Sequence, residues 1–317
     1  MYSNGHFGCI YSPIFFLENN QTTTKETPQI TQIKRRNNNE LKISKLIKSI
    51  PNNSLYFHTF VSCEPIQLGI MNEEYLQKVE TNTPFVLLKY NNIHFNSFES
   101  FTTNKSNKHL SDLYIYLLKS VKLLLKNKIV HLNANKETII VSDETPLLTD
   151  FSCAQLMHNT QLMDNHDLFS SSTKSNASNI FEIFTIHYLL ENELSSISIS
   201  NIYDLEKLYK KQNLLVDMKE GSVFLKRFIN KPIKQIIEEI STYYYTWDNY
   251  IISSIFLSLI EEKYSLHFNT QNKFVLEWIT LLKTNTTPSP IKRYTVESTI
   301  EKMEELVFNS EIRDLLE

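Results

Sequence analysis

Residues 129–154 read IVHLNANKETIIVSDETPLLTDFSCA, and this stretch decides how the rest of the chain is interpreted. Apolar runs at Ile139–Val141 and Leu147–Leu148 predict two short strands, because such side chains suit a pleated surface. The polar residues between the two runs predict a tight turn. A polar loop starting at His131 precedes the first strand, and an Asp-Phe pair starting at Asp150 follows the second. The stretch therefore predicts a loop, a short hairpin and a second loop.

Residues 1–95 predict short strands with one helix among them. The runs FGCIYSPIFF, ITQIK, SLYFHTFVSC and TPFVLLKYNNIHF are rich in aromatic and β-branched residues and are bounded by polar connectors, which is typical of strands. Between the second and third runs, ELKISKLIKSI has the spacing of a helix with one apolar face. That face is formed by Ile43, Leu46, Ile47 and Ile50.

From about residue 107 the pattern becomes helical. One long apolar stripe with helical spacing comprises Leu110, Leu113, Tyr114, Leu117, Leu118, Val121, Leu124 and Leu125. Beyond the hairpin, FEIFTIHYLLENE, DLEKLYKKQ and VFLKRFINKPIKQIIEEISTYYY look amphipathic, while WDNYIISSIFLSLIEE is apolar almost all round and predicts a buried helix. The fold class is therefore α+β, with a small β-rich part followed by a larger helical part.

Composition excludes several classes of protein. Lys and Arg number 32 against 35 Asp and Glu, so there is no basic excess of the kind that a general nucleic-acid binder shows. The longest apolar stretch, Tyr250 to Ile260, is too short to cross a bilayer, and the N-terminus lacks the pattern of a secretion signal. Three widely spaced cysteines suit a reducing compartment and form neither a disulfide framework nor a zinc cluster.

The loop, hairpin and Asp-Phe pair of residues 129–154 resemble the centre of eukaryotic-type protein kinases. In that family a catalytic loop H-R-D-x-x-x-x-N is followed by short strands and the motif D-F-G. One carboxylate orients the substrate hydroxyl and accepts its proton, and a second carboxylate and an Asn hold magnesium ions. The resemblance implies a two-lobed protein-kinase-like fold, with a small β-rich N-lobe at residues 1–95 and a larger helical C-lobe at residues 96–317.

Other segments extend the resemblance over most of the chain. SNGHFGCI, residues 3–10, is similar to the glycine-rich phosphate loop of kinases. TWDNYIISSIFLSLI is similar to the buried central helix of the kinase large lobe, with Asp248 at its Asp position. SPIKRYTVESTIEKM is similar to the signature of the last kinase helices, with Arg293 as the Arg.

The region between Phe151 and Trp247 lacks an ordinary A-P-E segment and looks like the protein kinase-like proteins of giant nucleocytoplasmic DNA viruses. NIFEIFTIHYLL and YYYTWDNYIISS are the counterparts of two segments of those proteins. The resemblance implies an extra helical insert at about residues 155–240. It also implies that Glu182 pairs with Arg293.

The chain departs from an active kinase at the residues that carry the chemistry. Asn133 stands at the position of the catalytic Asp, Asn135 at that of the Lys that steadies the γ-phosphate, and Thr138 at that of the magnesium-binding Asn. Asp150 keeps the carboxylate of D-F-G and is the candidate metal ligand, whereas Ser152 replaces the glycine. Leu132 replaces the Arg that would contact a phosphorylated activation segment. No catalytic residue is therefore intact.

The N-terminal candidates for nucleotide binding are Gly5, Phe7, Gly8, Lys34 and Glu40. The strand lysine is ambiguous, because ITQIK aligns with the kinase V-A-I-K either through Lys34 or two residues earlier through Gln32. Glu40 is the candidate partner of that lysine. Each assignment has a simpler alternative: the glycines could serve a hairpin turn, Asp150 could be a turn or cap residue, and His131 is interpreted as architectural.

The favoured hypothesis is a pseudokinase, a kinase-like domain that acts as a binding, scaffold or regulatory module and binds nucleotide weakly or not at all. The cofactor that the resemblance implies is ATP with Mg²⁺ or Mn²⁺. Protein partners are expected, without nucleic acid or membrane, in the cytoplasm of the host cell or in the virion. Two alternatives stay open: an active atypical serine/threonine protein kinase acting on protein, and a purely structural virion or interaction protein.

Overall fold

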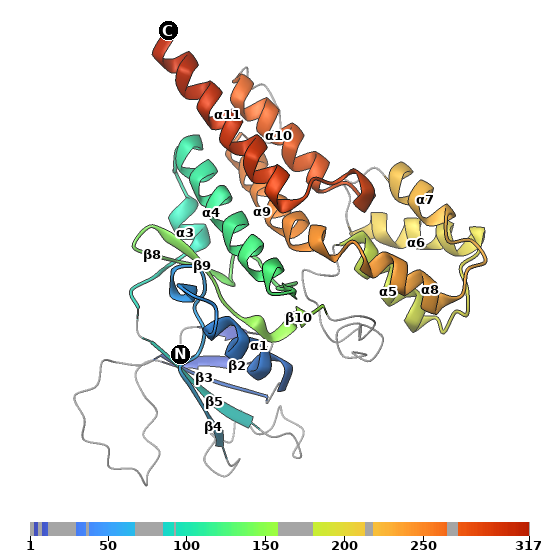
Figure 1. Cartoon of the computed structure of the whole chain (residues 1–317), viewed down its shortest axis with the longest axis horizontal. Coiled ribbons are helices and arrows are strands. Elements are labelled where there is room, and N and C mark those ends of the chain that lie inside the picture. Colours follow the sequence, from blue (N-terminus) through green and yellow to red (C-terminus); the bar gives the residue numbers. More distant parts are fainter. Residues whose placement is uncertain are drawn as a thin grey trace.

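The computed structural model describes residues 3–5, 8–11, 30–35, 38–66, 85–91, 93–157, 180–212, 218–264 and 272–316. Over these residues the protein has mixed α and β structure, with small antiparallel sheets and many helices, as the α+β prediction required. Figure 1 shows the largest sheet at one end of the molecule and the long helices at the other. No helix within the described residues is both long enough and apolar enough to cross a bilayer.

The N-terminal sheet has five antiparallel strands in the order β1-β2-β3-β5-β4. The strands are β1 (Ser3–Gly5), β2 (Gly8–Tyr11), β3 (Ile30–Arg35), β4 (Ser62–Ile66) and β5 (Phe85–Tyr90). Buried Val86 and Leu88 of β5 pack with Phe60 and with Leu41, which belongs to the helix α1 (Asn38–Lys48). A small apolar cluster thus joins this helix to the sheet.

The helix α1 lies where its apolar spacing predicts it. Ile43, Ile47 and Ile50 are buried in the main core, but Leu46 is 38% exposed. Glu40 and Ser44 are buried as well, so the contact face of α1 runs along Glu40, Ile43, Ser44 and Ile47, and Ile50 follows just after the helix. The prediction was wrong for Leu46, which lies at the edge of that face.

The predicted strand SLYFHTFVSC, residues 54–63, is wrong over most of its length. The chain forms a 3₁₀ turn at Asn53–Leu55, and β4 starts only at Ser62. The segment forms an isolated β-bridge between Phe57 and Leu148 of the hairpin, and its aromatic side chains pack on other elements: Tyr56 stacks on Tyr116, and Phe57 contacts Phe151. Tertiary packing of these rings overrides the local preference for a strand.

A second group of elements leads from the sheet through the sequence stretch described first. It comprises β6 (Asn96–Ser97), α3 (Phe98–Thr102), α4 (Asn107–Lys126), β7 (Ile129–Val130), β8 (Ile139–Ser142), β9 (Thr145–Leu148), the 3₁₀ turn η3 (Phe151–Cys153) and β10 (Gln155–Leu156). The predicted hairpin is therefore present as β8 and β9. Asp143 and Glu144 turn it, and both have positive φ angles, 47° and 64°.

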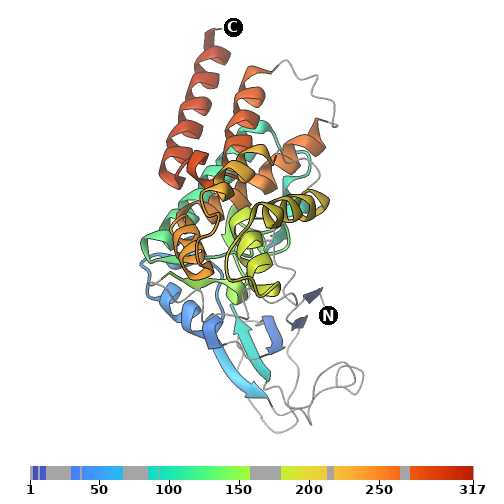
Figure 2. The ribbon, with the colours of Figure 1, turned by 90° about the vertical axis from the view of Figure 1, so that its right-hand side faces the viewer.

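The remaining described elements are helical. They are α5 (Phe181–Glu191), α6 (Ile199–Gln212), α7 (Lys219–Lys226), α8 (Ile233–Ser241), α9 (Trp247–Lys263), α10 (Lys273–Asn285) and α11 (Val296–Leu316). The single amphipathic stretch predicted from Val223 onward is two helices, because Asn230 takes a φ of 63° and Pro232 caps α8. Figure 2 shows α5 to α8 grouped together, apart from α10 and α11.

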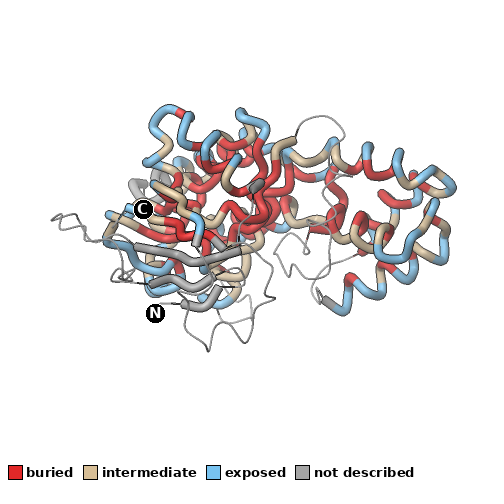
Figure 3. Tube along the Cα trace, turned by 90° about the horizontal axis from the view of Figure 1, so that it is seen from below, coloured by how far each residue is buried: buried red, intermediate tan, exposed pale blue. Residues whose placement is uncertain are grey.

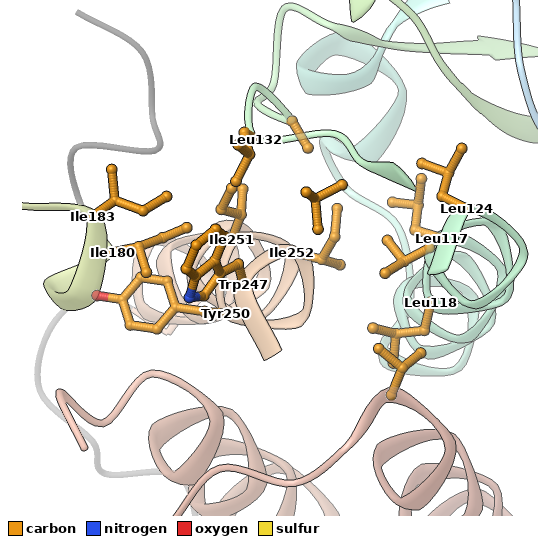
Figure 4. Packing of buried hydrophobic residues seen from close by; sticks show 14 of the residues in the cluster. Leu117, Leu118, Leu124, Leu132, Ile180, Ile183, Trp247, Tyr250, Ile251 and Ile252 are labelled. Carbon is orange, nitrogen blue, oxygen red and sulfur yellow. The ribbon is translucent and has the colours of Figure 1, made fainter. Parts of the chain in front are cut away.

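The helix α9 lies at the centre of the core, as its all-round apolar pattern predicts. Trp247, Ile252, Phe256 and Ile260 are fully buried. Figure 4 shows Trp247, Tyr250 and Ile251 facing side chains from α5 and from the loop after β7, with Leu117 and Leu118 of α4 nearby. Buried segments run through the middle of the molecule in Figure 3.

Gly221 lets α7 approach the core closely. A Cβ atom built there would lie 2.9 Å from the Phe181 ring and 3.0 Å from Pro288. The neighbouring Glu220 accepts a hydrogen bond from Thr287 and forms an ion pair with Lys292. The group α5 to α8 is therefore held against the loop between α10 and α11.

Candidate functional site

The loop that begins at His131 is anchored by the first turn of α9. The Asp248 carboxylate accepts hydrogen bonds from the backbone N–H groups of His131, at 2.7 Å, and Leu132, at 2.9 Å. Leu132 has a φ of 61°, which is unfavourable for a residue with a side chain. Burial raises the pKa of Asp248, and His131 and the two N–H groups oppose that rise. The carboxylate thus fixes a strained turn at the start of the loop.

The His131 ring joins the loop to the segment after β9. Its Nε2 lies 2.9 Å from the Thr149 carbonyl oxygen, and its Nδ1 accepts a bond from the Asn133 N–H. A ring that donates from Nε2 and accepts at Nδ1 is neutral. Burial lowers the pKa of His131, which also favours the neutral form. The ring packs edge-on against Phe151, so His131 has the architectural role predicted for it.

Asn133 and Asp150, two of the predicted site residues, are in direct contact. The Asn133 side chain lies 3.0 Å from the Asp150 carboxylate, and the contacting atom is the amide nitrogen Nδ2, because a carboxylate can only accept. Asp150 has a φ of 54°, and its other oxygen accepts the Ser152 N–H at 3.4 Å. Asn133 is buried and Asp150 is half-buried.

Asn135 and Thr138 direct their polar side-chain atoms into their own loop. The Asn135 carboxamide oxygen accepts the N–H groups of Glu137 and Thr138, and its nitrogen donates to the Asn133 carbonyl. The Thr138 hydroxyl donates to the same carbonyl at 2.7 Å and accepts the Asn135 N–H at 2.9 Å. These residues close the loop on itself by local side-chain bonding.

Glu40, near the start of α1, belongs to the same neighbourhood. Its side chain is buried, and α1 lies against η3, the turn that follows Asp150. Burial raises the pKa of Tyr90 well above its ordinary value, and the charges of Glu40 and Asp150 raise it further. Tyr90 is therefore coupled electrostatically to both carboxyl groups. Sequence reasoning missed Tyr90, since nothing in FVLLKY distinguishes it from an ordinary strand tyrosine.

The other N-terminal candidates are placed only through the register of the sheet. Gly5 lies opposite Gly8 at the end of the β1–β2 pair, and Gly8 lies opposite Lys34 of β3. Lys34 is opposite Val86, and Gln32 is opposite Leu88, so the register accommodates either residue at the strand-lysine position.

Phe7 lies outside the described residues. The pairing of Gly5 with Gly8 at the end of two adjacent strands suits the hairpin-turn alternative as well as the phosphate loop.

The predicted pairing of Glu182 with Arg293 is confirmed. The guanidinium donates from both terminal nitrogens to the two carboxylate oxygens, at 2.8 and 2.7 Å, and both side chains are fully buried. Trp247 donates its indole N–H to the same carboxylate, and the Arg293 guanidinium lies 4.7 Å from the centre of the Tyr250 ring. This pair joins α5 to the segment that precedes α11.

The donor set around Asp150 does not fit magnesium. A Mg²⁺ ion requires near-octahedral oxygen ligands, but Asn133 presents its amide nitrogen beside Asp150, and the Thr138 hydroxyl is bonded within the loop. The described residues also contain no group of three or more His, Cys, Asp or Glu side chains arranged to hold a metal. No protein-family model and no curated protein matches this chain.

Proposed function

We propose that the chain has a two-lobed protein-kinase-like fold and works as a pseudokinase, a binding, scaffold or regulatory module for other proteins. Three observations support the fold. A sheet with one helix precedes a larger helical part, Asp248 of the buried helix holds the loop at His131, and Glu182 pairs with Arg293. A protein kinase-like protein of a giant nucleocytoplasmic DNA virus would work in the host cytoplasm or in the virion.

The observation that carries the functional proposal is the Asn133–Asp150 hydrogen bond. At the position where a kinase needs a proton acceptor, the chain has an amide nitrogen that donates a hydrogen bond to the neighbouring carboxylate. A positioned general base typically contributes about 10²–10⁴-fold to rate. Asn at this position therefore removes the base, and its amide also donates a hydrogen bond to the carboxylate next to it.

The second observation is the closed loop of Asn135 and Thr138. A residue that steadies a phosphate has to extend its polar end away from its own backbone, whereas the Asn135 side chain bonds two backbone N–H groups and one carbonyl of the loop. The loop is therefore stable in this shape without a ligand. Any nucleotide would be bound weakly, by the hairpin at Gly5 and Gly8, by Lys34 and Glu40, and beside Asp150.

A phosphoryl-transfer assay with radiolabelled ATP tests the proposal. The wild-type chain, D150A and N133D would each be incubated with ATP, divalent cation and general protein substrates. D143A is the matched control, because Asp143 is an exposed aspartate with a similar backbone conformation in the β8–β9 turn. We expect no transfer above background from any of the four proteins.

Transfer by the wild type that survives in D143A and disappears in D150A would overturn the proposal in favour of an active atypical kinase. A parallel unfolding experiment with ATP measures nucleotide binding directly, because a ligand that binds only the folded form raises its stability. We expect at most a small increase in Tm.

A further inference from the structure

Both carboxylate oxygens of Asp150 accept hydrogen bonds from the protein itself. Its Oδ2 accepts the Asn133 amide at 3.0 Å, and its Oδ1 accepts the Ser152 N–H at 3.4 Å. Glu40 is buried in α1, and α1 contacts the η3 turn that directly follows Asp150, so a second acid lies on a neighbouring element. In such a place a carboxylate needs hydrogen-bond donors or a cation.

We propose, on the basis of the pseudokinase function proposed above, that the Asn133 amide takes the place of a divalent cation beside Asp150. The site is therefore independent of divalent metal. The amide contributes a hydrogen-bond donor but no net charge. Oδ2 keeps a second lone pair, but a cation bound to it would lie beside the positive end of the Asn133 N–H group, which opposes its binding.

The geometry makes a sharper statement about Asn133 itself. In an octahedral site with Mg²⁺–oxygen distances of about 2.0–2.1 Å, two adjacent oxygens are about 2.8–3.0 Å apart. The distance from Asn133 Nδ2 to Asp150 Oδ2 is 3.0 Å. The substitution N133D would therefore put a second carboxylate oxygen at the spacing of two neighbouring metal ligands. Without a cation, the two carboxylates would repel each other.

The experiment compares thermal unfolding of the whole chain in chelator and in Mg²⁺ or Mn²⁺ at matched ionic strength, so that general salt effects cancel. The variants are the wild type, N133D, D150N and the double variant N133D/D150N. We expect the wild type and D150N to have the same Tm with and without the cation. N133D should have a lower Tm than the wild type in chelator.

Adding Mn²⁺ should raise the Tm of N133D by about 4 °C when the ion is present at about a hundredfold excess over its Kd. The double variant should lose this response, because it has only one of the two carboxylates. A wild-type Tm that rises with Mn²⁺ and no longer rises in D150N would overturn the inference. So would an N133D protein that folds but does not respond to the ion.

Direct binding of Mn²⁺ provides a second readout, since the electron paramagnetic resonance signal of the free ion falls as the ion is bound. If N133D does not fold, the comparison of the wild type with D150N still tests the inference. Mn²⁺ binding that the wild type shows and D150N lacks would refute metal independence. The phosphoryl-transfer assay on the same samples separates the two proposals. Transfer by the wild type counts against the pseudokinase function, whereas Asp150-dependent cation binding without transfer counts only against the metal-free site.

Discussion

Removing Arg293 should destabilise the protein far more than removing an exposed arginine. In R293M, Glu182 would remain fully buried with the indole N–H of Trp247 but without its cationic partner. Breaking a buried ion pair by removing one partner typically costs about 3–5 kcal/mol, because the remaining charge is uncompensated. The carbonyl oxygens of Thr287 and Pro288 would also lose their donor. We therefore expect a loss near the upper end of that range.

The effect can be converted into a shift in Tm. Unfolding entropy is about 2.1 cal/mol/K per residue, or about 0.67 kcal/mol/K for all 317 residues unfolding together. A loss of about 3–5 kcal/mol then lowers Tm by about 5–8 °C. Calorimetry measures this shift, and urea titration measures the free energy of unfolding.

R227M is the matched control. Arg227 pairs with Glu239 at 3.5 Å, but its side chain is 46% exposed, and such surface pairs contribute about 0–1 kcal/mol. The double variant E182L/R293M should recover much of the loss, since replacing both charges leaves none buried and unpaired. An R293M protein as stable as R227M, or a double variant less stable than R293M, would refute this account of the pair.

Three further predictions concern other parts of the chain. At Gly221 a Cβ atom has no room, so G221A should lower the free energy of unfolding by about 1 kcal/mol, after allowing for the better helix propensity of Ala, and G221V should lower it more. Urea titration measures both, and V223A, on the exposed side of α7, is the control that should change little. In the β8–β9 turn, E144G should raise the free energy of unfolding by about 0.5–1 kcal/mol, because glycine relieves the strain of a positive φ. E144A keeps that strain and should not be more stable than the wild type, so equal stability of the two variants would contradict this prediction. Burial lowers the pKa of His58 below that of the unfolded chain, so its contribution to stability is present above about pH 6.5 and is lost as pH falls toward the folded pKa. Urea titrations from about pH 8 to pH 5 should therefore show a smaller loss of stability in H58Q than in the wild type, and equal slopes would contradict the assignment.

The regular elements were predictable where one periodic pattern decided burial. The stripe of α4 and the all-round apolar sequence of α9 have no competing interpretation, and both helices lie where they were predicted. The local pattern failed over most of residues 54–63, where Tyr56 and Phe57 pack on α4 and on Phe151, and only an isolated bridge from Phe57 to Leu148 replaces the expected strand in this part of the described chain. Such contacts depend on segments distant in the chain, which a local window does not include.

For the candidate site, the sequence predicted which residues belong to it but not how their side chains bond to one another. Asn133, Asn135, Thr138 and Asp150 were named from a resemblance of motifs, and the structure brings them into one hydrogen-bonded group. The direction of each hydrogen bond could not be predicted, because an Asn side chain can face its own backbone or the neighbouring loop with equal chemical ease. Tyr90 was missed for a similar reason, since only the folded chain places it near Glu40 and Asp150.

The closed loop of Asn135 and Thr138 has an evolutionary consequence. Exchanging Asn135 for lysine would remove three hydrogen bonds from the loop, and exchanging Thr138 for asparagine would remove the hydroxyl that joins both sides of it. Each step would weaken the protein before the remaining steps could confer any benefit, and most single changes of this kind are selected against. Under the proposed pseudokinase function, the loop therefore opposes a stepwise change to the kinase residues, because each single exchange loses hydrogen bonds that the present residues make.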